Sequence, residues 1–130
     1  MKTSYGFGKE VATSFQETVP KVVEALRKEG FGILSEIDVA ATLRNKLGKE
    51  MPPYRILGAC NPSLAHQVLE LDPSVGLLMP CNAVVRQDAS GKVHVELLDP
   101  SVMPAMIQRP EIEPLAAEAR QRLQRVLASL

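Results

Sequence analysis

The sequence predicts an α+β fold, in which two long helices cover one face of an antiparallel β-sheet of about five strands. Two segments, residues 15–29 and 115–129, carry apolar side chains at helical spacing. Short apolar segments between them are bounded by glycine, proline, asparagine and aspartate, which is typical of strands joined by turns. The length of 130 residues, with 45% hydrophobic and 23% charged residues, indicates a single domain over residues 1–130.

The first predicted elements are a strand over residues 4–11 and the long helix that follows it. Ser14, with a glutamate three residues later, forms a capping box that marks the helix start. The apolar face of this helix consists of Phe15, Val19, Val22, Val23 and Leu26. Pro20 is unfavourable inside a helix, so either the helix kinks there or regular helix begins nearer Thr18. Gly30 is a suitable C-cap.

The next predicted elements are a strand over residues 31–37, a short helix over 39–47 and a strand over 54–60. Asp38 directly precedes the short helix and is interpreted as its N-cap, because a carboxylate accepts the free N–H groups of a first turn. Gly48 follows the last apolar position of this helix and is expected to end it.

Two further strands are predicted after a second inserted helix. Asn61 and Pro62 mark the start of a helix, because asparagine caps helices and proline is tolerated in their first turn. After a turn at residues 72–76, the fourth strand is expected over 77–87. A hairpin then returns the chain into a fifth strand over residues 93–98.

The chain ends with irregular short helix over residues 101–109 and the long helix opened by Pro114, which completes a β-α-β(4)-α order. Residues 77–85 are apolar on both faces, and such a strand needs cover on both. We expect an inserted helix and a second copy of the chain to cover the second face together. Further apolar surface comes from Met103, Met106 and Ile107. These segments together predict a symmetric homodimer.

Composition and missing motifs exclude several function classes. Fifteen basic and fifteen acidic residues cancel, which argues against a nucleic-acid partner. No apolar run reaches the roughly 20 residues of a membrane span, and the N-terminus has no signal-peptide core. Two cysteines without a C-x-x-C motif indicate a reduced, cytoplasmic protein. No phosphate-binding glycine loop, G-x-S-x-G or H-E-x-x-H motif occurs, so enzymatic activity stays open, catalytic residues are unknown and no cofactor is predicted.

Two Cys-Asn dipeptides, Cys60-Asn61 and Cys81-Asn82, are the candidate ligand-binding residues of the sequence. Cys60 precedes a predicted helix N-terminus, where backbone N–H groups favour a thiolate, although a small buried cysteine at a strand end also simply packs. Because the strands carrying them are expected to be antiparallel neighbours, the two dipeptides should lie within one or two strand spacings. We expect free thiols and a small polar spot in an apolar setting.

Other polar residues have local explanations. Asn82 lies inside an apolar strand and must find partners or face a pocket. Asp38, if it turned toward the cysteines instead of capping its helix, would supply a base and joins the candidate set. His66 is expected on the outer face of its helix, and His94 is expected to be an exposed strand residue. The histidines and cysteines lack zinc-ligand spacing, so no metal site is predicted.

Three stretches carry a resemblance to a known family: "EGFGILSEIDVAATL", "PYRILGACNPSLAHQVLELDPSVGLLMPCNAVV" and "VELLDPSVM". Together they resemble the bacterial and archaeal family called domain of unknown function 302, over essentially the whole chain. The paired Cys-Asn segments are the most specific marks. The resemblance implies a fold similar to the TATA-binding-protein-like architecture, with extra helices and dimer formation, and it implies no established activity. Kinship of fold to a DNA-binding protein does not transfer function.

Three functions are compatible with these observations. The first is an uncharacterised homodimeric domain that binds a small ligand between sheet and helices, near the Cys-Asn segments. The second is a thiol-based redox or transfer protein that uses Cys60 together with Cys81. The third is a protein-interaction module without a ligand. A pocket that reaches the Cys-Asn segments separates the first two from the third.

Overall fold

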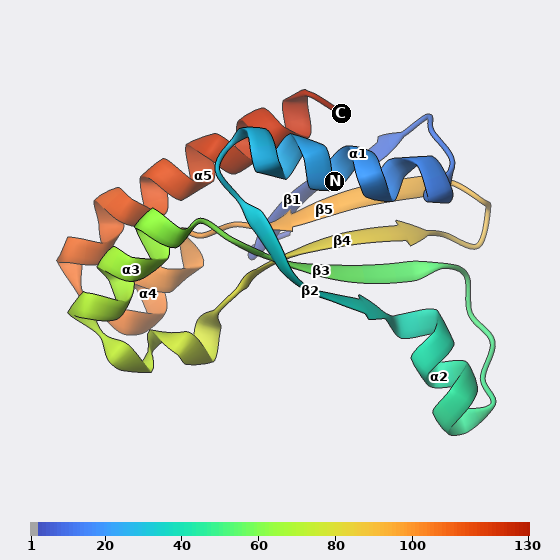
Figure 1. The fold of residues 1–130 in the computed structure, drawn as a ribbon, viewed down its shortest axis with the longest axis horizontal. Helices are drawn as coiled ribbons and strands as arrows, with labels where there is room; N and C mark the ends of the chain where they lie inside the picture. Colours follow the sequence, from blue (N-terminus) through green and yellow to red (C-terminus); the bar gives the residue numbers. More distant parts are fainter. Residues whose placement is uncertain (1–2) are drawn as a thin grey trace.

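A computed structural model describes residues 3–130 and shows a five-stranded, fully antiparallel sheet (Figure 1). The strands are β1 (Gly6–Val11), β2 (Gly32–Asp38), β3 (Tyr54–Cys60), β4 (Cys81–Gln87) and β5 (Val93–Leu98). Their spatial order is β1-β5-β4-β3-β2, with every neighbouring pair antiparallel. The predicted fold class and the β-α-β(4)-α order are therefore confirmed.

The two long helices, α1 (Phe15–Lys28) and α5 (Glu113–Ala128), lie side by side on one face of this sheet (Figure 1). Leu26 of α1 and Leu123 of α5 are at most 2% exposed and share one buried core with Leu57 of β3. Along each strand, alternate side chains enter this core, since successive residues of a strand point to opposite faces. The prediction that both long helices cover the same face is confirmed.

Local signals set the start of α1 as expected. Ser14 Oγ accepts a hydrogen bond from the Glu17 N–H at 3.2 Å and donates one to the Glu17 carboxylate at 2.9 Å. The helix runs from Phe15 through Pro20 to Lys28, so the alternative start nearer Thr18 is wrong. Pro20 is exposed on the outer side of α1.

The short helices α2 (Val39–Leu47) and α3 (Pro62–Leu71) also begin at their predicted caps. Asp38 accepts a hydrogen bond from the Ala41 N–H at 2.9 Å. Gly48 ends α2 in the left-handed conformation, with φ of 65°, which glycine adopts without steric cost. The helices thus follow the capping residues in the sequence.

The fourth strand is shorter than predicted. Residues Pro73–Leu78 form a 3₁₀ helix, η1, and β4 begins only at Cys81, so the prediction of strand over 77–80 is wrong. The physical reason is that Asp72 caps η1 through the Ser74 N–H, at 3.1 Å, and Pro73 stands at the first helical position.

A second apolar cluster lies beyond the end of the sheet, where α3, η1, α4 (Val102–Ile107) and η2 (Pro110–Ile112) meet α5 (Figure 1). Its buried members, which define the end cluster, are Val68, Val75, Met103 and Ile112. Leu78, Met79 and Ile107 pack against it. Several residues expected to need a second subunit as cover are therefore covered within the chain, although Leu77 stays 89% exposed and Met106 63%.

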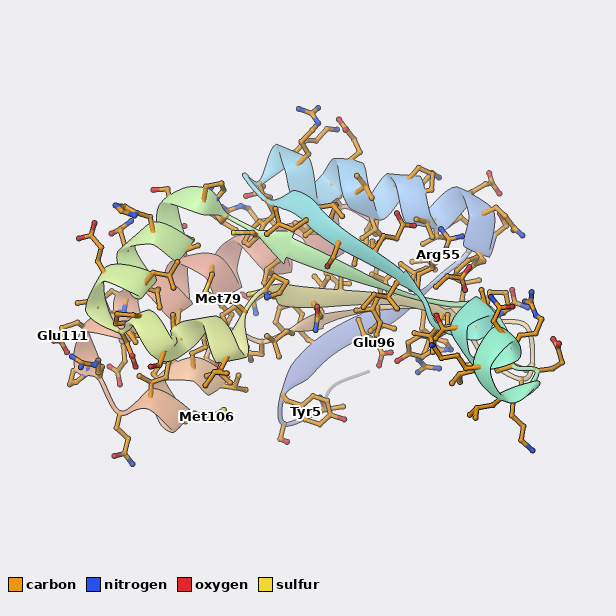
Figure 2. The ribbon with its side chains drawn as sticks, turned by 60° about the horizontal axis from the view of Figure 1, so that its bottom comes forward. Tyr5, Arg55, Met79, Glu96, Met106 and Glu111 are labelled. Carbon is orange, nitrogen blue, oxygen red and sulfur yellow. The ribbon has the colours of Figure 1, made fainter. Side chains whose placement is uncertain are left out.

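The described helices leave the opposite face of the sheet open (Figure 2). This open face is defined by the strand residues Tyr54, Ile56, Asn82, Val84, Arg86, His94, Glu96 and Leu98. Arg86 and Glu96 form an ion pair at 2.7 Å there. The sheet is consequently a two-layer structure with one uncovered side.

Candidate functional site

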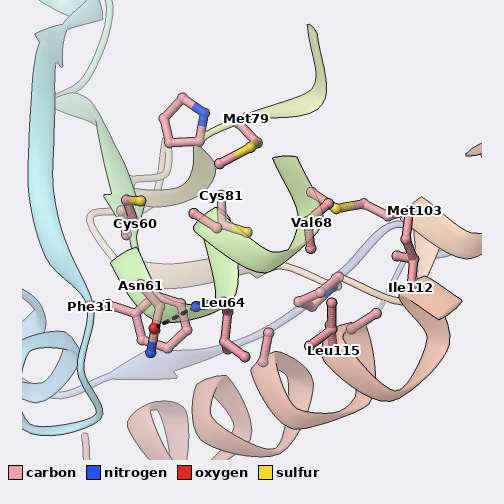
Figure 3. A pocket seen from close by; sticks show the side chains of 16 residues that line it. Phe31, Cys60, Asn61, Leu64, Val68, Met79, Cys81, Met103, Ile112 and Leu115 are labelled. Atoms are coloured by element: carbon pink, nitrogen blue, oxygen red, sulfur yellow. Dashed lines mark hydrogen bonds between the residues drawn. The ribbon is translucent and has the colours of Figure 1, made fainter. Parts of the chain in front are cut away.

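A cavity of about 60 Å³ lies where the ends of β3 and β4 meet α3, α5 and the end cluster (Figure 3). Cys60, Asn61 and Cys81 line it, so the structure brings together three of the five candidate residues. Met79 and Met103 also line it, and the remaining wall consists of aliphatic, proline and phenylalanine side chains. The cavity therefore joins the core of the sheet to the end cluster.

Strand register explains why the two Cys-Asn dipeptides meet. In the β3–β4 pair, Ala59 lies opposite Cys81 and Gly58 lies opposite Asn82. Adjacent strands are separated by roughly 4.8 Å, so the predicted proximity of the dipeptides is confirmed. Both thiols are free, as expected.

Asn82, in contrast, points away from the cavity. It is exposed on the open face, where it lines a hollow of about 270 Å³ together with Tyr5, Tyr54 and Glu96. The side chain of Cys81 faces the helices, and its neighbour along the strand must face the other way. Asn82 therefore does not share a site with the two cysteines.

Asp38 also lies apart from the cysteines. In the β2–β3 pair it stands opposite Arg55, while Cys60 stands opposite Gly32 at the other end of the pair. Its carboxylate caps α2 and lies 3.7 Å from the Arg55 guanidinium. The structure thus supports the capping role and gives Asp38 no path to act as a base toward Cys60.

Asn61 combines a structural role with its place at the cavity. It is 9% exposed, and its side-chain oxygen accepts a hydrogen bond from the Leu64 N–H at 3.2 Å, which satisfies one free donor of α3 (Figure 3). The cap holds the first turn of α3 against the end of β3, and this turn contributes the cavity residues Leu64 and Ala65.

The surroundings of both thiols disfavour their thiolate forms. Burial raises the pKa of Cys60 above its ordinary value, which favours the packed cysteine over the alternative of a thiolate at the helix N-terminus. Burial, with a smaller contribution from the charge of Cys60, raises the pKa of Cys81 to about 11. Both side chains are therefore neutral S–H groups near pH 7, because desolvation disfavours the charged form.

Sequence reasoning missed the two cavity methionines. Met79 stands two residues before Cys81, where the sequence predicts a strand, and the alternation of a strand gives no signal of a site. Met103 reaches the cavity only through the folding of α4 against α3 and α5. No pattern local in the sequence marks it.

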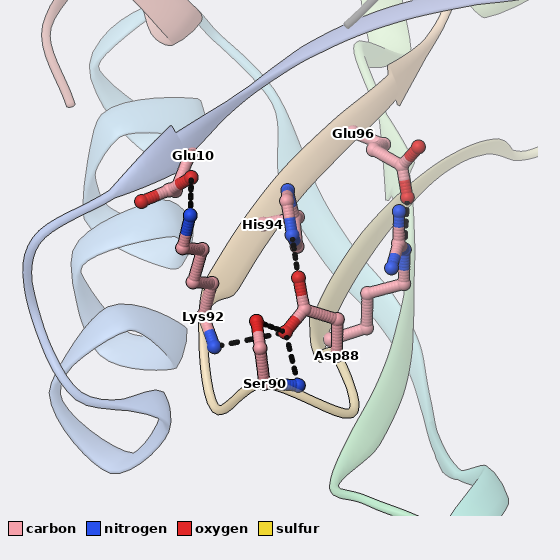
Figure 4. Close-up of polar contacts among 7 residues, drawn as sticks. Glu10, Asp88, Ser90, Lys92, His94 and Glu96 are labelled. Carbon is pink, nitrogen blue, oxygen red and sulfur yellow. Dashed lines mark hydrogen bonds and ion pairs between the residues drawn. The ribbon is translucent and has the colours of Figure 1, made fainter.

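A second polar cluster closes the β4–β5 hairpin (Figure 4). Asp88 accepts hydrogen bonds from the N–H groups of Ser90, at 2.9 Å, and Lys92, at 3.0 Å, and its other oxygen lies 2.7 Å from His94 Nε2. The bond to His94 is the largest cause that holds the pKa of Asp88 well below its usual range. The His94 side chain is only 16% exposed, so its prediction as an exposed residue is wrong. These contacts stabilise the turn.

The other histidine behaves as expected. His66 is exposed on the outer side of α3, with its Nε2 2.6 Å from Glu70. Within residues 3–130, no group of three or more histidine, cysteine, aspartate and glutamate side chains is arranged to hold a metal ion.

Comparison with known proteins identifies related domains over nearly the full length. The family model "Domain of unknown function DUF302" matches residues 7–130. The crystal structure of an uncharacterized conserved protein DUF302 from Bacillus stearothermophilus is similar, with a TM-score of 0.88 and 31% sequence identity. That similarity covers 97% of this chain and 98% of the other.

Curated relatives match over a smaller share of their own length. Fluoride-specific ion channel FluC 1 of Brucella suis biovar 1 (strain 1330) is 26% identical over 88 residues, which is 68% of this chain and 34% of that protein. FluC 1 of Brucella abortus biovar 1 (strain 9-941) is also 26% identical over 88 residues, or 32% of its length. The chain thus spans about a third of these relatives. Among residues 3–130, no helix is long and apolar enough to cross a membrane.

Proposed function

The chain belongs to the DUF302 family, and we propose that it is a homodimeric domain that binds a small, largely apolar ligand in the cavity between the sheet and the helices. The observation that supports this most directly is the cavity itself, which both cysteines and Asn61 line. Pockets of this kind, apolar with few polar groups, are the usual layout of small-molecule sites. The proposal includes a reducing, cytoplasmic setting, which the two free thiols support.

The size and chemistry of the cavity limit the ligand. A volume of about 60 Å³ accommodates a xenon atom or a short aliphatic group and is too small to enclose a nucleotide or a large ring system. No charged side chain lines the wall, so an ion without a specific partner would lose its hydration without compensation. A neutral ligand with one weakly polar end fits best, since the thiols and Asn61 supply the few polar contacts.

The thiol-based alternative has less support. Nucleophilic attack requires the thiolate, and burial raises the pKa of both Cys60 and Cys81. No basic side chain lines the cavity to stabilise a thiolate there. We therefore keep reversible ligand binding as the proposed activity.

Methionine methyl groups report directly on occupation of the cavity. In protein labelled with ¹³C at the methionine methyls, xenon or a short-chain alcohol is expected to shift the NMR signals of Met79 and Met103, which line the cavity. Met106, 63% exposed, serves as the internal control and should not shift. Ala116→Leu, which fills the cavity from α5, should abolish the shifts, whereas Ala117→Leu, at an exposed position, should leave them unchanged. Equal responses in these two variants would contradict the proposal.

The open face is the surface we assign to the dimer contact. It carries the half-buried apolar residues Ile56 and Val84, and Tyr5, 65% exposed, lies next to it in the hollow that Asn82 and Val84 also line. It also carries the oppositely charged Arg86 and Glu96. In a dimer with two-fold symmetry, the open face of one copy contacts the same face of the other copy. Arg86 of each copy then lies near Glu96 of its partner. A second copy of the chain therefore matches both the apolar character and the charges of this face.

Sedimentation equilibrium tests this contact. The chain is expected to be a dimer at micromolar concentration, and Val84→Arg, in the open face, should shift it to monomer because a long, charged side chain would have to be buried in the contact. Leu77→Arg, at a residue 89% exposed on η1, is the control and should leave the dimer intact. A monomeric parent protein, or equal effects of both variants, would refute the assignment.

A further inference from the structure

Both tyrosines of the chain border one hollow on the open face. The chain has two tyrosines and no tryptophan. Tyr5 directly precedes β1 and Tyr54 begins β3, yet both line the hollow of about 270 Å³ to which Asn82 and Glu96 also contribute. Strands β5 and β4 lie between β1 and β3, so the two aromatic side chains border the hollow from opposite sides. Figure 2 shows Tyr5 and Glu96 on this side of the molecule.

Strand register places an amide and a carboxylate next to each other in this hollow. Val84 of β4 lies opposite Glu96 of β5, and Asn82 stands two residues before Val84 on the same face. Asn82 and Glu96 are therefore diagonal neighbours on adjacent strands, with Cβ atoms about 7 Å apart. Within residues 3–130 no hydrogen bond joins their side chains. A small molecule between them can contact both.

The charges around the hollow favour a neutral occupant. One carboxylate oxygen of Glu96 accepts a hydrogen bond from Arg86 Nε at 2.7 Å, so this carboxylate is already paired with a cation. Its second oxygen can still accept a hydrogen bond, and the Asn82 amide can both donate and accept. Among the described residues that line the hollow there is no lysine or arginine. An anionic ligand would therefore have no counter-ion there and would face Glu96.

We propose that the hollow binds a small, neutral, planar molecule that carries an N–H donor beside an acceptor, the chemistry shared by aromatic carboxamides and by the edges of nucleobases. The N–H group donates to Glu96, and the acceptor receives a hydrogen bond from the Asn82 amide. The apolar side chains of Val84 and Leu98 line the hollow as well and offer a surface to the ring. Tyrosine rings at the border add favourable aromatic contacts.

This site goes beyond the proposed function, because it lies on the opposite face of the sheet from the cavity that the two cysteines line. It lies within the face that we assign to the dimer contact. A contact closing over this face would bury Asn82 and Glu96, and buried polar groups without partners are costly. A bound molecule supplies such partners, so the site and the dimer contact are compatible.

The test is an NMR titration of the full chain labelled with ¹³C in the tyrosine rings. Nicotinamide and adenine, added separately, represent the two sources of the proposed chemistry, and the tighter binder identifies the source. At least one of them should shift the signals of both Tyr5 and Tyr54, with a dissociation constant on the order of a millimolar. The methionine methyl signals of the cavity should not respond. Nicotinate, which has a carboxylate in place of the carboxamide, should bind roughly tenfold more weakly or worse, because it loses the donor and faces Glu96.

A pair of asparagine variants tests the polar contact. Asn82→Ala should weaken binding of the probe by roughly 5- to 100-fold, the usual effect of leaving a polar partner unpaired. Asn45→Ala, at an exposed position of α2, is the matched control and should bind as the parent does. Circular dichroism checks the folding of both variants before titration.

Three results would overturn the inference. They are the absence of tyrosine shifts with both probes at roughly ten times the expected dissociation constant, nicotinate binding as tightly as nicotinamide, and equal effects of the two asparagine variants. Xenon shifts of the methionine signals and sedimentation of the parent chain are measured without these probes. Failure of the hollow as a site is therefore distinguishable from failure of the proposed function.

Discussion

Leu123→Ala is expected to lower the free energy of unfolding by about 2–5 kcal/mol, the usual range for removing a buried leucine side chain. Leu123 is 2% exposed and lies in the core that α1 and α5 form on the sheet. The loss combines the transfer free energy of the deleted methyl groups with the cavity left behind. This core joins α1, α5 and the sheet, so the loss of stability should be among the largest for a single substitution.

Urea denaturation followed by circular dichroism measures this change. Leu127→Ala, one turn further along α5, is the matched control, because Leu127 is only half-buried at the edge of the same core. It should cost clearly less than Leu123→Ala. Equal losses in the two variants would contradict the packing of α5 against the sheet through Leu123.

Gly58→Ala is expected to destabilise the protein by about 1–3 kcal/mol, the typical cost of overpacking. Gly58 is buried in β3, and a Cβ there would meet Ser35 Oγ and would lie 2.8 Å from Pro80 Cγ. The serine hydroxyl can rotate, but the proline ring is rigid and immediately precedes Cys81. The substitution should therefore also displace the start of β4, which lines the cavity.

Gly32→Ala is the control for this change. Gly32 also lies in a strand, β2, but no atom lies within 4 Å of the position that a Cβ would take. Alanine should be neutral there or stabilising by up to about 1 kcal/mol, because it reduces the conformational entropy of the unfolded chain. Both variants are compared by thermal and urea unfolding. A Gly58→Ala protein as stable as Gly32→Ala would show that Pro80 does not approach β3 closely.

Much of the fold could be predicted because the signals are local. The capping residues Ser14, Asp38 and Asn61 act on N–H groups three residues away, so the neighbouring sequence suffices to place the helix starts. The apolar stripes of α1 and α5 left one way to bury Leu26 and Leu123, on a shared face of the sheet. Strand order along the chain then implied that β3 and β4 pair, and with them the two Cys-Asn dipeptides.

The prediction of a strand failed at residues 77–80, where contacts with distant segments and not the local sequence decide the structure. Residues 77–80 are apolar enough for a strand, but Leu78 and Met79 pack on the end cluster, whose members come from α3, α4 and η2. The free energy of that burial depends on segments up to the start of α5. Alternation alone therefore assigned these residues to the wrong element.

For the candidate site, the sequence by itself determined that Cys60 and Cys81 lie close together, because hydrogen-bonded neighbouring strands leave little freedom in register. Only the tertiary structure decided what surrounds them. Asn82 lies on the open face because neighbouring residues of a strand point to opposite sides of the sheet. Met103 lines the cavity from α4. The surrounding side chains bury both thiols and so raise their pKa values. Burial depends on atoms contributed by distant segments, and desolvation is what sets the protonation of a thiol.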